Sequence, residues 1–75
     1  MSEKLPRVTA NEMIKIIEKL GFHISRQSGS HKIYKNDKGK RVTIAYHSGI
    51  ILHPKMVKGI LIDIGLSVDE FKKLL

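Results

Sequence analysis

The sequence predicts a two-layer α+β domain in which two main helices pack on one face of a three-stranded antiparallel sheet and leave the other face free. Three observations predict this fold. Apolar residues recur with helical spacing towards both ends of the chain, whereas apolar and polar residues alternate in the middle. The turns between the alternating stretches are too short for parallel crossovers. The 75 residues are predicted to form one domain, with a loose lead-in over residues 1–7 and the folded part over residues 8–75.

The first helix is predicted to begin after Thr9. Thr9 and Glu12 have the spacing of a capping box, in which the two side chains satisfy unpaired amides of the first helical turn. The apolar residues that follow recur on one face: Ala10, Met13, Ile14, Ile17 and Leu20. Gly21 is expected to end this helix, because glycine readily adopts the left-handed conformation found after many helices.

Three strands are predicted to follow. The first begins at Phe22 and is broken by the polar residues 27–30, and the second covers residues 31–36. The turn residues 36–39 separate it from the third strand, residues 41–46. Together the strands are expected to form an antiparallel meander.

The second main helix is predicted to begin at His53-Pro54, because proline is best tolerated in the first helical turn. Its apolar face consists of Met56, Val57, Ile60, Leu61 and Ile64, and Gly65 ends it. Gly59 inside this helix is interpreted as a sign of close helix packing. Ser67 and Glu70 form a second capping box, which predicts a short C-terminal helix and so an α-β-β-β-α order with one added helix.

Positive charge is concentrated in one segment of the chain. The formal net charge is +7, from 14 basic and seven acidic residues. Between residues 26 and 41 there is one acidic residue, Asp37, and six basic ones: Arg26, Lys32, Lys35, Lys38, Lys40 and Arg41. Such a cluster is typical of a nucleic-acid-binding surface, although a merely solvated surface is the alternative.

Composition also excludes several classes of protein. The chain has no cysteine, which excludes disulfides and thiolate metal sites and favours a cytoplasmic location. It has no apolar run long enough to span a membrane and no secretory leader, so no membrane partner is expected. A domain this small leaves no room for a deep cavity, so we expect an open binding face and no small-molecule cofactor.

His31 is the strongest candidate for chemistry. Gly29 and Ser30 leave space beside its ring, and the basic residues around it could neutralise phosphate. Tyr34 lies close by, with a ring on which a base could stack. Strand alternation puts His31 on the same face as Ile33, a residue type that a helix typically covers. Taken alone, these residues leave two readings open, a catalytic base and a half-buried strand histidine.

The other three histidines are weaker candidates. His23 is expected to be a surface or packing residue. His47 and His53 are six positions apart without acidic neighbours, which is poor spacing for a metal pair, and no metal site is predicted. His53 is expected to cap the second main helix, and His47 is expected near the groove at the strand ends.

Several segments together resemble the HicA-like mRNA interferase toxins of bacterial and archaeal toxin–antitoxin systems. They are "LGF", "RQSGSHKIY", "RVTIAYHSG", "LHPKMVKGIL" and "IGLSVDEFKKLL", which span residues 8–75. The most specific part is the triplet Gly29-Ser30-His31. The resemblance implies a double-stranded-RNA-binding-domain-like fold, a metal-independent ribonuclease activity that depends on His31, and inhibition by a HicB-type antitoxin. Gly29 and Ser30 then flank the active site.

The resulting hypothesis is a toxin that cleaves mRNA with His31 as general base. The RNA would be bound by the basic cluster together with Tyr34 and His47. Candidates for the general acid are His47, Lys35 and Tyr34, in that order. One alternative is a non-catalytic RNA-binding module, because double-stranded-RNA binders share the fold. Another is a protein whose main task is to bind an antitoxin or a regulator.

Overall fold

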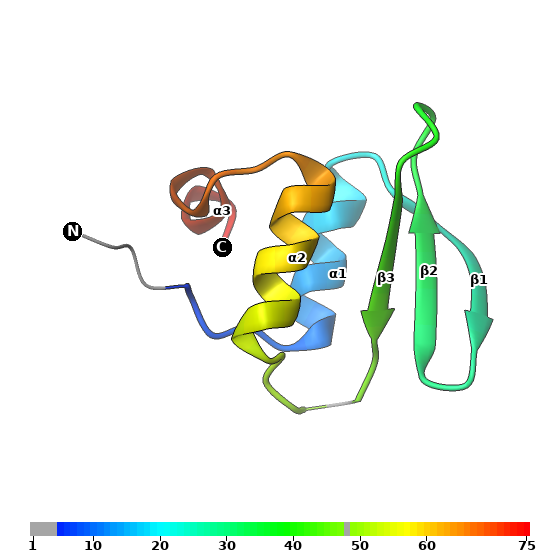
Figure 1. Ribbon diagram of the computed structural model, residues 1–75, viewed down its shortest axis with the longest axis horizontal. Coiled ribbons are helices and arrows are strands. Elements are labelled where there is room, and N and C mark those ends of the chain that lie inside the picture. The colour runs from blue at the N-terminus through cyan, green and yellow to red at the C-terminus, as the bar shows by residue number, and fades with distance from the viewer. Residues whose placement is uncertain (1–4, 48) are drawn as a thin grey trace.

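The computed structural model describes residues 5–47 and 49–75, and it confirms the predicted α+β fold (Figure 1). Residues 1–4 of the predicted lead-in and Ser48 lie outside the described residues. The elements in chain order are α1 (Ala10–Lys19), β1 (His23–Ser28), β2 (His31–Lys35), β3 (Arg41–Ala45), α2 (Pro54–Ile64) and α3 (Val68–Leu74). Within residues 5–47 and 49–75, no helix has the length and apolar character needed to cross a membrane.

The predicted helix ends are confirmed. The Glu12 amide donates to Thr9 Oγ1 at 3.2 Å and the Thr9 amide donates to Glu12 Oε1 at 2.8 Å, which is the capping box expected at the start of α1. Ser67 and Glu70 repeat this arrangement at α3. Gly65 ends α2 with a left-handed φ of 74°.

The sheet is a meander in the order β1-β2-β3, with both neighbouring pairs antiparallel. His31 pairs with Ala45 on one side and with Ser28 on the other. The β1–β2 ladder contains a bulge between Ile24 and Arg26, where β1 has one residue more than β2. Because a bulge reverses the alternation of a strand, Arg26 lies opposite Ile33 and on the same face of the sheet.

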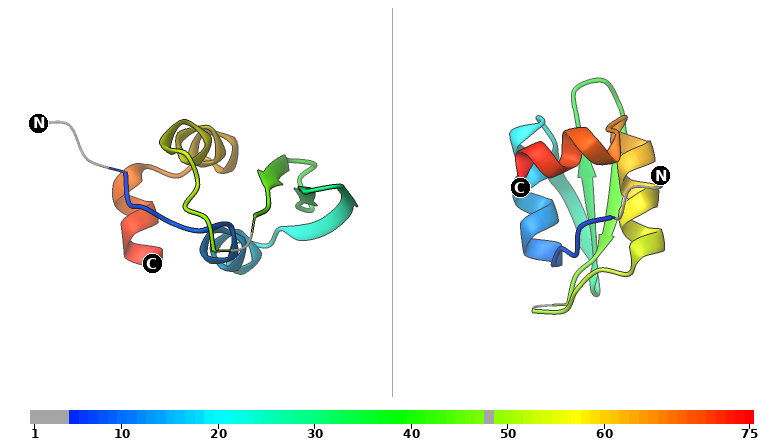
Figure 2. Two further views of the ribbon diagram at one scale, coloured as in Figure 1. Left: turned by 90° about the horizontal axis from the view of Figure 1, so that it is seen from below. Right: turned by 90° about the vertical axis from the view of Figure 1, so that its left-hand side faces the viewer.

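Both helices lie on one side of the sheet, as predicted (Figure 2). Tyr34, Val42 and Ile44 point from β2 and β3 into a core shared with α1 and α2. The helix layer does not reach β1, whose six residues are all exposed. Ile24 on β1 is accordingly 52% exposed, while Phe22 just before the strand is buried. The sheet therefore extends beyond the helices at its β1 edge (Figure 2).

The segment before α1 is tied to the loop before α2. The Leu52 amide donates to the Val8 carbonyl at 2.8 Å, and Thr9 and Ile51 form an antiparallel bridge. Val8 is buried, and Leu5 packs against the core although it falls in the predicted lead-in. This tie holds the start of α2 beside the start of α1.

The interpretation of Gly59 as a sign of close packing is wrong. A Cβ atom added there would meet no heavy atom within 4 Å. We therefore expect Gly59→Ala to raise the free energy of unfolding by about 0.5–1 kcal/mol, because alanine reduces the freedom of the unfolded chain and favours the helix. Urea denaturation of the two proteins measures this difference. A destabilised Gly59→Ala protein would show that α2 has a close neighbour at this position.

Candidate nucleic-acid interface

A tight turn sets the position of His31. Residues 29 and 30 form a two-residue hairpin loop, with Gly29 at a φ of 58°. A type II′ turn needs such a positive φ at its first central residue, which glycine adopts without strain. The Ser30 carbonyl accepts a hydrogen bond from the Tyr46 amide at 2.6 Å, which ties the turn to the end of β3. His31 is thus the first residue of β2 and is held between two neighbouring strands.

His31 points to the free face of the sheet, and its side chain is exposed. Paired residues of an antiparallel ladder lie on the same face, so the register assigns the members of this open face. They form three rows across the sheet: Ser28, His31 and Ala45; Arg26, Ile33 and Thr43; His23, Lys35 and Arg41. The expectation that a helix covers the face of Ile33 is wrong, because the helices cover the opposite face, which carries Tyr34.

The open face is strongly cationic. It presents the side chains of Arg26, Lys35 and Arg41, and the strands β1, β2 and β3 contain no acidic residue. Arg26 is a diagonal neighbour of His31, at a distance of about 7–8 Å that a long side chain can span. Lys35 is four residues from His31 along β2, or about 13 Å. An anion at His31 is therefore within reach of Arg26, while Lys35 and Arg41 lie further along the same face.

Lys32 and Tyr34 do not belong to this group. They alternate with His31 along β2 and point to the helix side. The Lys32 Nζ lies 4.0 Å from the centroid of the Tyr46 ring, an attractive cation–π distance. Tyr34 is 3% exposed, so its ring is not available for a base to stack on. Burial, followed by the charge of Glu18 and by Tyr46, raises the pKa of the Tyr34 hydroxyl.

The remaining predicted contacts lie at the two ends of the sheet. Lys38 and Lys40 are in the β2–β3 turn, where both of their amides donate to Asn36 Oδ1, at 3.1 and 2.8 Å. His47 is exposed and follows β3 by two residues. Because Ala45 pairs with His31, His47 lies at the same end of the sheet as His31, and the two lysines lie at the opposite end.

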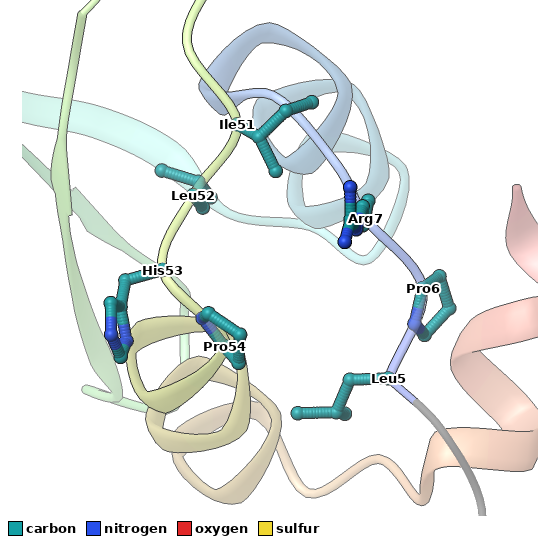
Figure 3. Close-up of a pocket in the computed structure, with 7 residues that line it drawn as sticks. All are labelled: Leu5, Pro6, Arg7, Ile51, Leu52, His53 and Pro54. Carbon is teal, nitrogen blue, oxygen red and sulfur yellow. The ribbon is translucent and has the colours of Figure 1, made fainter.

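His53 caps α2, as predicted, by accepting a hydrogen bond from the Lys55 amide at Nδ1 (3.1 Å). It also lines a groove between residues 5–7 and residues 51–54 (Figure 3). None of the residues predicted to act on RNA lines this groove. Among the described residues, no three histidine or acidic side chains are grouped so that they could hold a metal ion.

Sequence reasoning missed two hydroxyl residues next to His31. Ser28 pairs with it directly, and Thr43 is a diagonal neighbour on β3. Strand alternation and the hairpin register would have identified Thr43. The place of Arg26 depends on the bulge, for which the sequence of β1 contains no signal of its own.

Comparison with known proteins gives one match. A scan against protein-family models matches residues 10–66 to the HicA toxin family of bacterial toxin–antitoxin systems. The matched region runs from α1 to just beyond α2 and includes the turn that carries His31. No curated protein matches the chain in a sequence search. Because the family match covers well over half of the 75 residues, the chain belongs to the HicA toxin family of toxin–antitoxin systems.

Proposed function

We propose that this toxin is an endoribonuclease that cleaves mRNA on the open face of its sheet. His31 accepts the proton of a ribose 2′-hydroxyl, and the 2′-oxygen attacks the adjacent phosphorus. The bond from phosphorus to the 5′-oxygen breaks, and that oxygen takes up a proton. The products are an RNA with a 2′,3′-cyclic phosphate and an RNA with a 5′-hydroxyl.

One observation carries this proposal. His31 is exposed at the end of β2, on a face whose strands have cationic side chains and no acidic ones. The cationic groups attract a polyanion to this face, and an imidazole without its second proton accepts a proton within hydrogen-bond reach. An exposed strand edge residue of purely structural use would gain nothing from these neighbours.

The cations differ in what they can do for a phosphate at His31. Arg26 is the nearest on the open face, and its guanidinium can donate two parallel hydrogen bonds to phosphate oxygens. It is the best candidate to stabilise the extra negative charge of the transition state. Lys35 and Arg41 are placed to bind neighbouring phosphates of the same strand, and Lys38 and Lys40 extend this positive charge to the far end of the sheet.

The geometry favours His47 as the general acid. It lies at the same end of the sheet as His31, whereas Lys35 is about 13 Å away along β2. Tyr34 is buried, and the raised pKa of its hydroxyl makes it a poorer proton donor. His47 would then protonate the departing 5′-oxygen.

The partner of the toxin is an antitoxin, which we propose to be of the HicB type and to cover the His31 face in the cytoplasm. Acidic groups on it would face Lys35 and Arg41, since complementary charge speeds association and selects the partner. In that arrangement RNA and antitoxin compete for the same cations.

Incubation of the purified toxin with RNA tests the proposed activity. Shortened RNA with EDTA present is the expected result, because no step above uses a metal ion. RNA that is bound and stays intact would contradict the proposal and favour the non-catalytic RNA-binding module.

The division of the cations between the two faces gives a quantitative prediction. Removing one phosphate contact to a single strand reduces the slope of log affinity against log salt by about 0.7. We expect this reduction for Arg26→Ala and for Lys35→Ala. Lys32→Ala makes the same change in charge on the helix side, and the slope should stay close to that of the parent. Fluorescence anisotropy with a labelled single-stranded RNA, in a His31→Ala background, measures the slopes; equal reductions for all three would contradict the assignment of faces.

A further inference from the structure

The outer edge of β1 has no neighbouring strand. β1 pairs with β2 alone, and it lies at the end of the sheet that extends beyond the helices (Figures 1 and 2). All six of its residues are exposed. An edge strand of this kind is a template on which another extended chain can form backbone hydrogen bonds. We propose that the outer edge of β1 binds an extended, acidic segment of the antitoxin as a fourth strand.

The directions of the backbone groups identify where the added strand would bind. The Ser30 carbonyl points towards β3, because it accepts from the Tyr46 amide. Successive residues of a strand direct their backbone groups to opposite sides, so His31 and Ile33 bond to β1. Their partners Ser28 and Arg26 therefore face β2, and the residue between them, Gln27, directs its N–H and C=O to the outer edge. By the same alternation Ile24 also points outward.

The bulge limits the length of the added strand. It separates the outward-facing residues Ile24 and Gln27 by three positions instead of an even number, so a regular partner cannot follow the whole of β1. The added segment is therefore short, with Gln27 as its main backbone contact. On the helix side of the edge, the 52% exposed Ile24 offers it an apolar contact.

Charge argues for an acidic partner and against a second copy of this chain. β1 and β2 carry Arg26, Lys32 and Lys35 and no acidic residue. Two such edges brought together would place like charges opposite each other, which destabilises a sheet. The chain as a whole has a formal charge of +7. Membership of a toxin–antitoxin family supplies a protein partner, and an acidic strand from that partner satisfies both the open edge and the charge.

The test is Gln27→Pro in complex with the antitoxin encoded beside this toxin. Proline has no N–H and is tolerated on an edge strand where the lost N–H faces solvent. Gln27→Ala is the matched control, since it also loses the bond from Gln27 Nε2 to the Gly29 carbonyl (3.0 Å) and keeps the backbone N–H. We expect Gln27→Pro to weaken antitoxin binding by about ten-fold or more, the scale of one or two lost backbone hydrogen bonds, and Gln27→Ala by less than about three-fold.

Hydrogen exchange provides a second readout that does not depend on how well the proline variant folds. The Gln27 amide of the parent toxin should exchange rapidly in the free protein and slowly in the complex. Equal affinity of the proline and alanine variants, or equal exchange of this amide in both states, would overturn the proposal. Neither readout uses RNA cleavage, so the outcome is independent of the proposed nuclease activity.

Discussion

Phe71→Ala should lower the free energy of unfolding by about 3–5 kcal/mol, the usual cost of truncating a fully buried phenylalanine. Phe71 is 0% exposed and is the one residue of α3 that is fully inside the core. Small domains are stable by about 5–15 kcal/mol in total, so this loss is a large part of the stability. Chemical denaturation followed by far-UV circular dichroism measures it.

This prediction bears on where the functional domain ends. α3 lies beyond residues 10–66, the region that matches the toxin family. Lys72 is the adjacent exposed residue, and Lys72→Ala should change the stability by less than about 0.5 kcal/mol. A Phe71→Ala protein as stable as the Lys72→Ala control would mean that α3 is dispensable for the core.

His31→Ala should reduce RNA cleavage by about 10²-fold or more, as expected when a proton-transfer group is removed. Because the His31 side chain is exposed, the variant should unfold within about 0.5 kcal/mol of the parent. RNA binding should persist, since the cationic side chains are unchanged. Single-turnover cleavage, denaturation and RNA affinity measured on one preparation separate these effects.

The other histidines are the controls for this substitution. His23 is exposed on the same open face but in the row furthest from His31, so His23→Ala should cleave RNA at nearly the parental rate. His53→Ala removes a helix cap and should cost about 1 kcal/mol of stability without a comparable loss of cleavage. His47→Ala should show a partial loss if His47 is the acid. Similar activity losses in all four variants would instead indicate a general effect on folding or charge.

Local signals made most of the fold predictable. The capping pairs at Thr9 and Ser67, the proline after His53 and the glycine at residue 65 each have a physical role at a helix end that does not depend on the rest of the chain. The strand order followed from the short turns. Leu20 shows the limit of periodicity: it fits the apolar face of α1 but is 37% exposed, because the helix ends beside it.

The arrangement of the site was less predictable, because it depends on the relation between strands. Alternation within β2 correctly separates His31 from Tyr34, but it cannot tell which of the two faces the helices cover. Ile33 suggested the wrong face, since an isoleucine at the centre of an otherwise polar surface is indistinguishable in sequence from a core residue. The bulge that brings Arg26 to the open face changes the register by one residue without a glycine or proline to mark it.

The chemistry of the cleaved RNA ends is the most direct test of the central claim, that His31 activates a ribose 2′-hydroxyl. Mass spectrometry of a short RNA incubated with the parent toxin should reveal a 2′,3′-cyclic phosphate on one product and a 5′-hydroxyl on the other. The same RNA incubated with folded His31→Ala protein should remain almost entirely intact. Products that end in a 3′-hydroxyl and a 5′-phosphate, or equal amounts of product from the two proteins, would contradict the account.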